Sequence, residues 1–104
     1  MAREAIEDHT GERFVSSATI WEVEIKRAAG KLQAPPDLGD VALRHGFDTL
    51  DITFEHARRA GRLPAHHTDP FDRMIVAQAL AEGLTIVTAD RQIARYPAPT
   101  LPAR

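Results

Sequence analysis

Residues 69–88 read DPFDRMIVAQALAEGLTIVT, and they are the clearest guide to the fold. The first four have the form of a helix start: a capping acid, Asp69, then proline at the first helical position and a second acid, Asp72, three residues after the cap. The following helix is apolar on nearly every side, and Gly83 ends it before the β-prone run of residues 84–88. A helix buried on most sides that leads into such a run is typical of a central strand in a parallel sheet.

The rest of the chain alternates short strands and helices around this unit. The pattern predicts strands at residues 13–16 and 47–52, helices at 17–29, 38–45 and 54–60, and one helical turn after residue 90. Residues 2–8 are expected to form the last two turns of a helix, and residues 97–102 at most an edge strand. Strands that alternate with helices favour parallel pairing through right-handed crossovers. We therefore expect one α/β domain over residues 1–104, a sandwich with a parallel central sheet.

Helical spacing also predicts which side chains are buried. In the helix of residues 17–29, one buried face is predicted from the helical spacing of Ala18, Trp21, Ile25 and Ala28 or Ala29. The histidines predict no metal site, because His66-His67 point apart in an extended loop and no third nitrogen ligand has a suitable spacing. His56 lies near a helix end, where we expect it on the surface.

Composition narrows the class of protein. The chain has 104 residues, 43% of them hydrophobic, with 13 Lys and Arg against 15 Asp and Glu and no cysteine. A chain of this length and composition can bury a core. The absence of cysteine excludes disulfides, thiolate catalysis and cysteine-ligated metals. A net charge of −2 argues against a broad basic surface for nucleic acid, so any RNA chemistry needs a local site. With no signal peptide and no apolar stretch long enough for a spanning helix, we expect a cytoplasmic protein without a membrane partner.

Three acids are predicted at one edge of the sheet, where ligands bind beyond the carboxyl ends of the strands. Glu22 lies in the first turns of the helix after the strand at 13–16, Asp72 in the first turn of the buried helix, and Asp90 just beyond the strand that ends at Thr88. Clustered carboxylates repel one another unless protonated or bridged by a cation. Mg²⁺ or Mn²⁺ would remove that repulsion and suits phosphodiester hydrolysis. Thr88 is placed to bond a carboxylate or the loop backbone.

Each acid also has a purely structural interpretation. Glu22 can pair with Lys26 at i, i+4 on the helix surface. Asp72 can be the reciprocal partner of a capping box, and Asp90 can cap the final short helix. Asp69 is best explained as the N-cap of the buried helix, which leaves it a supporting role at most.

Three blocks of sequence, taken in order, resemble the PIN-domain ribonucleases and, within them, the VapC-type toxins of bacterial type II toxin–antitoxin pairs. The matching blocks are residues 15–22 with Ile25-Lys26 and Gly30-Lys31-Leu32, then residues 66–79, and lastly residues 84–90. The resemblance runs from about Arg3 over nearly the whole chain.

The resemblance implies a PIN-like three-layer α/β/α sandwich and a catalytic, metal-binding role for Glu22, Asp72 and Asp90, the second to fourth acids of the family's site. Thr88 would take the supporting polar position. Members use Mg²⁺ or Mn²⁺ to cut RNA, form homodimers, and are silenced by a VapB-like antitoxin whose tail enters the active-site groove.

The chain departs from the family pattern at its start. Members begin with a central apolar strand that ends in the first catalytic Asp, whereas residues 2–8 resemble the end of the helix that follows it. Asp8 follows helical residues in this interpretation and cannot replace that Asp. Loss of the strand predicts two half-sheets with open edges. Two hypotheses follow: a ribonuclease toxin whose sequence lacks a genuine N-terminal segment, or a non-catalytic remnant that at most binds an antitoxin or another partner.

Overall fold

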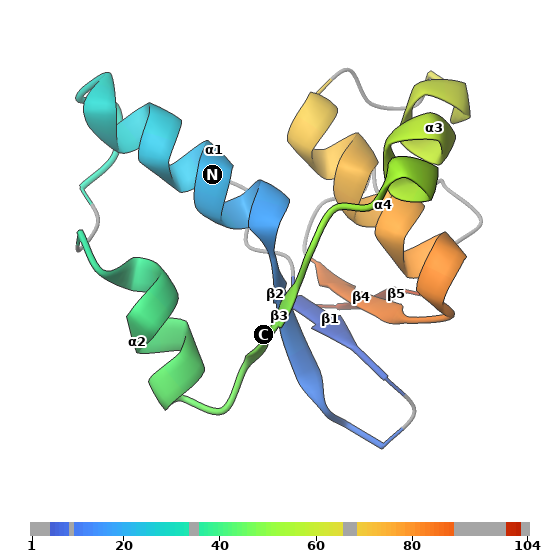
Figure 1. Cartoon of the computed structure of the whole chain (residues 1–104), viewed down its shortest axis with the longest axis horizontal. Helices are drawn as coiled ribbons and strands as arrows, with labels where there is room; N and C mark the ends of the chain where they lie inside the picture. Colours follow the sequence, from blue (N-terminus) through green and yellow to red (C-terminus); the bar gives the residue numbers. More distant parts are fainter. Residues whose placement is uncertain (1–4, 9, 34–35, 66–68, 89–99, 103–104) are drawn as a thin grey trace.

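A computed structural model describes residues 5–8, 10–33, 36–65, 69–88 and 100–102. Its elements are β1 (Ala5–Glu7), β2 (Arg13–Ser16), α1 (Ser17–Ala28), α2 (Leu38–Arg44), β3 (Asp48–Leu50), α3 (Phe54–Arg62), α4 (Pro70–Glu82), β4 (Thr85–Thr88) and β5 (Thr100–Pro102). The strands form one sheet in the order β3-β2-β1-β4-β5. In Figure 1, α1 and α2 lie on one side of β2 and β3, and α3 and α4 on the other. The predicted α/β class with flanking helices is confirmed.

The first described segment differs from the prediction. Residues 5–7 are a strand and not the end of a helix, and this strand occupies the centre of the sheet, antiparallel to both β2 and β4. The pairs β2–β3 and β4–β5 are parallel, as the alternation of elements predicts. The expectation of two half-sheets with open edges is therefore wrong, because β1 joins them into one sheet.

A tight hairpin explains why β1 is a strand. The Asp8 carboxylate accepts hydrogen bonds from the backbone N–H groups of Thr10 and Glu12, both at 2.9 Å, and Gly11 has a φ of +84° that suits glycine. Ile6 is paired with a residue on each neighbouring strand and is 1% exposed. Burial of Ile6 and two backbone ladders outweigh the weak helical pattern of a seven-residue segment.

The hydrophobic core lies between the sheet and α4. Its buried members are Ile6, Ala18, Ile75, Val76, Ala79, Leu84 and Ile86. Residues 75–79 of α4 are all buried, which confirms the prediction of a helix covered on most sides. Gly83 ends α4 in the left-handed conformation, and Leu84 N–H then bonds the Ala79 carbonyl at 2.9 Å. This turn directs the chain from α4 into β4.

Helices α3 and α4 form an antiparallel pair tied at both ends. At one end the Arg73 guanidinium donates to the carbonyls of Ala60 and Leu63, at 2.8 and 2.9 Å, and so satisfies carbonyls at the end of α3. At the other end, His56 Nε2 lies 2.8 Å from a carboxylate oxygen of Glu82. His56 is 1% exposed, so the prediction of a surface histidine is wrong. In the described ranges no helix has the length and apolar character needed to cross a membrane.

Candidate acidic site

Glu22 projects from α1 at the edge of the sheet where β2 ends. The Ser16 hydroxyl caps the helix by accepting from the Ala18 N–H at 3.0 Å, so α1 begins directly at the end of β2. Glu22 is 3% exposed, and its carboxylate lies 2.8 Å from the Lys26 ammonium. The i, i+4 pair considered from the sequence is therefore present, but its carboxylate is buried. A surface helix pair would leave both groups in water.

Asp72 occupies the first turn of α4. The Asp69 carboxylate accepts from the N–H groups of Phe71 and Asp72 at 2.8 and 3.3 Å, which confirms Asp69 as the N-cap. Asp72 itself is 3% exposed. The positive end of the α4 dipole favours negative charge at both acids. Asp69 thus sets where α4 begins, and Asp72 follows as a buried carboxylate.

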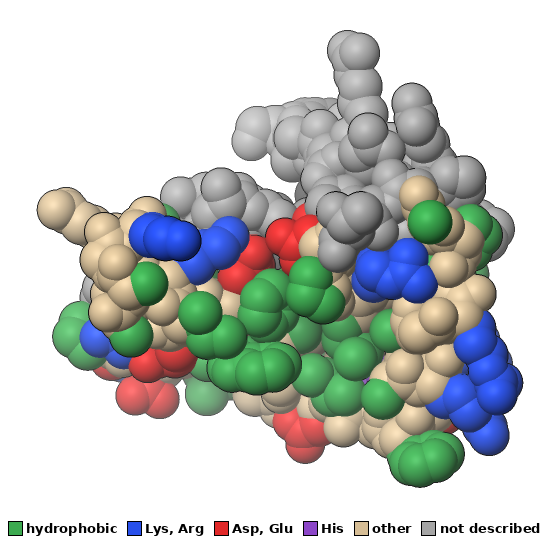
Figure 2. Space-filling view, turned by 90° about the horizontal axis from the view of Figure 1, so that it is seen from above, with side chains coloured by type: hydrophobic (Ala, Val, Ile, Leu, Met, Phe, Trp, Pro, Cys, Tyr) green, Lys and Arg blue, Asp and Glu red, His purple; other side chains and the backbone are tan. Residues whose placement is uncertain are grey.

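Acids of both helices act on the charge of Lys26. Its hydrogen bond with Glu22 raises the pKa of the Lys26 ammonium, and the charges of Glu22, Asp69 and Asp72 add to the rise, while partial burial opposes it. The ammonium is thus near acids of both α1 and α4. Figure 2, which views the molecule from this end, shows acidic side chains beside basic ones and next to a broad apolar area. The structure brings Glu22 and Asp72 to one edge, as the sequence predicts.

Two of the predicted site residues cannot be placed with these. Asp90 lies outside the described residues. Thr88 is the last residue of β4, but its side chain also lies outside them. Asp8 belongs to the opposite edge, because β1 is antiparallel and Glu7 pairs with Arg13 and Thr85 at the starts of β2 and β4. Asp8 therefore does not take the place of the family's first acid.

Two of the predicted acids have the donor type that a hard divalent cation prefers. Within the described ranges, no group of three or more His, Cys, Asp or Glu side chains gathers in a way that could hold a metal ion. Glu22 and Asp72 supply two buried carboxylates, and a cationic group already neutralises Glu22. Mg²⁺ is commonly held by one or two carboxylates together with waters and substrate phosphates. The oxygen donors of these two acids suit Mg²⁺ or Mn²⁺ and not a soft metal.

An apolar groove of about 180 Å³ adjoins the acids, lined by Ala18, Trp21, Ile52, Pro70, Phe71 and Met74. Trp21 and Phe71 meet across it edge to face, with ring centroids 5.3 Å apart, and each directly precedes one of the two acids in the sequence. Trp21 is 61% exposed and Ile25 44%, so the predicted buried face of α1 is wrong apart from Ala18. The helix instead turns Glu22 and Val23 inward.

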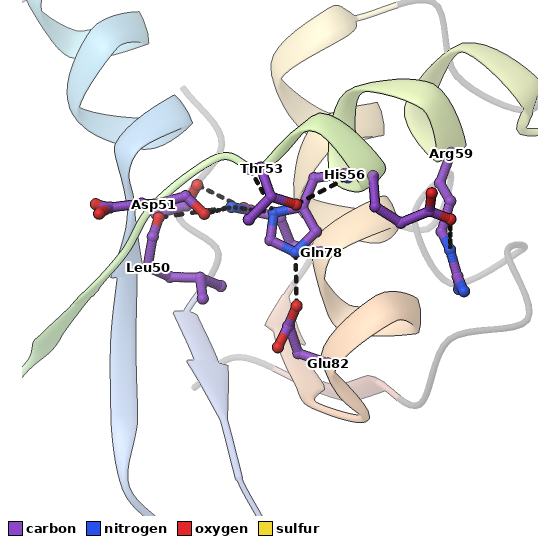
Figure 3. Close-up of polar contacts among 9 residues, drawn as sticks. Leu50, Asp51, Thr53, His56, Arg59, Gln78 and Glu82 are labelled. Carbon is purple, nitrogen blue, oxygen red and sulfur yellow. Dashed lines mark hydrogen bonds and ion pairs between the residues drawn. The ribbon is translucent and has the colours of Figure 1, made fainter.

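A buried polar cluster holds the ends of β2 and β3 against the middle of α4 (Figure 3). Gln78 is fully buried; its carbonyl oxygen accepts from the Ser16 hydroxyl at 2.6 Å. Its amide nitrogen donates toward the carbonyls of Asp51 and Leu50 at 3.3 and 3.5 Å. This cluster was not predicted from the sequence. A glutamine in the middle of an otherwise apolar helix was the signal that could have revealed it.

The start of α3 joins the same cluster. Thr53 and His56 form a capping box in which the Thr53 N–H donates to His56 Nδ1 at 3.1 Å, and the His56 N–H donates to the Thr53 hydroxyl at 3.1 Å. Because Nδ1 accepts, the ring proton is on Nε2, which donates to Glu82 (Figure 3). The cluster therefore fixes the position of α4, and hence of Asp72, relative to the strand ends.

Comparison with protein-family models identifies a family for the chain. Residues 1–99 match the model of the PIN domain family. No curated protein matches the chain. The family match points to nuclease function in general, and PIN domains typically use divalent metal ions.

Proposed function

The chain belongs to the PIN domain family, and from this premise we propose that it is a metal-dependent endoribonuclease, the toxin of a VapC-type toxin–antitoxin pair. The observation that carries the proposal is the pair of buried carboxylates, Glu22 and Asp72, on two helices that meet at the edge where β2 ends. Burial of two carboxylates to 3% exposure costs stability, and a cation-binding role would account for that cost.

Glu22 and Asp72 would hold the cation, with Asp90 as a third acid and Thr88 and Asp69 in support. When bound there, Mg²⁺ or Mn²⁺ would supply an activated water and would stabilise charge on the scissile phosphate. The chain's own residues would position the metal ligands. Glu22 and Asp72 project from the helices α1 and α4, and the Gln78 cluster holds α4 against the strand ends. Precise placement by helices and strands is what such a site requires.

The proposed partners follow from the surface around the site. The substrate is RNA, bound locally, because a net charge of −2 leaves no broad basic face. A second copy of the chain and a VapB-like antitoxin are the proposed protein partners. The apolar area near Trp21 and Ile25, with a second groove of about 390 Å³ whose lining includes Ile20 and Leu43, offers the surface for them.

A second candidate function is a binding module without catalysis. It is favoured by the antiparallel direction of β1, which takes its carboxyl end, and Asp8, away from the acidic site. In this alternative the apolar area is the functional surface, and Glu22 is a structural partner of Lys26.

Cleavage of single-stranded RNA distinguishes the two functions. The protein with Mn²⁺ should cut a labelled RNA, chelation with EDTA should stop the reaction, and Asp72→Asn should abolish it. Asp40→Asn is the matched control: it makes the same change at an exposed acid in the first turn of α2 and should retain activity. If the folded wild-type protein leaves the RNA intact in Mn²⁺, the nuclease proposal is wrong and the binding module is favoured.

A further inference from the structure

The Lys26 ammonium neutralises the charge of the Glu22 carboxylate. The Glu22 side chain is 4% exposed and its carboxylate oxygen Oε2 lies 2.8 Å from the Lys26 ammonium. A carboxylate this deeply buried is costly unless a cation or several hydrogen bonds compensate it. The ion pair with Lys26 is therefore part of what permits a charged Glu22 at this position.

Lys26 differs from Glu22 in its access to water. Its side chain is 34% exposed, and it lies in the last turn of α1. A lysine has a flexible four-carbon stem with a compact charge at its end, so the ammonium can leave Glu22 for solvent without unfolding the helix. The buried partner is thus fixed, whereas the exposed partner can be exchanged.

The acids at the start of α4 also interact electrostatically with the Lys26 ammonium. The negative charges of Asp69 and Asp72 act on it in addition to that of Glu22. The ammonium therefore lies on Glu22, one of the two acids that would hold a divalent cation, and the charge of the other, Asp72, also acts on it. Two cations cannot share one carboxylate oxygen at close range without strong repulsion.

We propose that Lys26 is the built-in counter-cation of the acidic site, which a divalent ion must displace from Glu22 in order to bind. This inference rests on the proposed metal-dependent function and adds that metal affinity is set by exchange with a side chain of the protein. In the metal-free protein Lys26 stabilises the buried Glu22. In the metal-bound protein the Lys26 ammonium would have left the Glu22 carboxylate.

Metal titration of Lys26 variants tests the exchange. Mn²⁺ binding is measured by isothermal titration calorimetry on the full chain after EDTA dialysis, for wild type and for Lys26→Met. Loss of the competing cation should tighten Mn²⁺ binding roughly tenfold, because one opposing unit charge is removed from a partly buried site. Lys26→Arg keeps the charge and should bind Mn²⁺ no more tightly than wild type.

Arg27→Met is the matched control, because it removes one positive charge from the same turn of α1 but from an ion pair with exposed Glu24. It should change Mn²⁺ affinity less than twofold. Thermal melting gives a readout independent of affinity: without metal, Lys26→Met should melt below wild type, and saturating Mn²⁺ should raise its melting temperature by more than it raises that of wild type.

The outcomes separate this inference from the proposed function. If wild type binds Mn²⁺ and Lys26→Met binds it equally or more weakly, the exchange is refuted while the metal site stands. An Arg27→Met variant that tightens binding as much as Lys26→Met would also refute it, since the effect would then be one of general charge. If no variant binds Mn²⁺, both the inference and the metal-dependent function fail.

Discussion

Substitution of Gln78 by methionine tests the polar cluster that fixes the strand ends against α4. Gln78→Met keeps the length and most of the volume of the side chain but removes its hydrogen bonds. The buried Ser16 hydroxyl, 2% exposed, then loses its acceptor, and the carbonyls of Leu50 and Asp51 lose a weak donor each.

The expected cost follows from these bonds. A buried hydroxyl left without its partner costs about 1–3 kcal/mol, and each of the two longer bonds, at 3.3 and 3.5 Å, adds roughly 0.5 kcal/mol. We expect Gln78→Met to lower the free energy of unfolding by about 2–4 kcal/mol, a large share of the ~5–15 kcal/mol of a typical domain. For a domain of this size the melting temperature should fall by roughly 10–20 °C.

Urea unfolding followed by circular dichroism measures the effect, and a double-mutant cycle assigns it. Ser16→Ala removes the helix cap, at about 1 kcal/mol, and leaves the Gln78 carbonyl without its donor. The double variant has no unpaired partner across the Ser16–Gln78 contact, so its cost should be at least ~1 kcal/mol below the sum of the single costs. Gln33→Met, the same change at an exposed residue, should stay within about 0.5 kcal/mol of wild type. Additive single effects, or a cost for Gln78→Met below that of Gln33→Met, would show that the Gln78 hydrogen bonds do not stabilise the fold.

Two further predictions concern other parts of the fold. Asp69→Ala removes the cap of α4 and should lower stability by about 1 kcal/mol in thermal or urea unfolding; an unchanged stability would show that the cap contributes nothing. Glu12 shares a hydrogen bond with Asp48, which, together with the charge of Asp48, raises the pKa of the Glu12 carboxyl. The folded protein therefore holds that proton more tightly than the unfolded chain, and the stability it contributes is lost as pH rises through the raised pKa. Glu12→Gln should raise the melting temperature at neutral pH, and this gain should disappear in acid; a gain of equal size at every pH would contradict it.

Local pattern was sufficient for the part of the fold around α4. Asp69 and Pro70 mark the start of that helix and Gly83 its end, and both were predicted because caps and left-handed glycines depend on neighbouring residues in the chain. The same pattern placed Glu22 and Asp72 at one edge. Glu22 lies in the opening turns of the helix that follows β2, and α4 must begin at the same edge because its C-terminal end leads into β4.

Local sequence patterns did not predict the features that depend on contacts between residues far apart in the chain. Residues 5–7 were predicted to be helical because their apolar and charged residues fit a helical turn. They instead form a strand that is hydrogen-bonded to β2 and to β4, and β4 lies some eighty residues further along the chain. Trp21 and His56 were misplaced for the same kind of reason. Helical spacing identifies a common face, but the neighbouring element that covers or exposes it is set by packing.

The amino-acid sequence alone therefore determined the α/β class, the limits of α4 and the oxygen-donor chemistry of the acids, because caps, periodicity and side-chain type are local properties. The tertiary structure decided the direction of β1, the burial of Gln78 and His56, and the influence of the α4 acids on the charge of Lys26. These features depend on contacts between segments far apart in the chain, and a local pattern carries no information about which segments will meet.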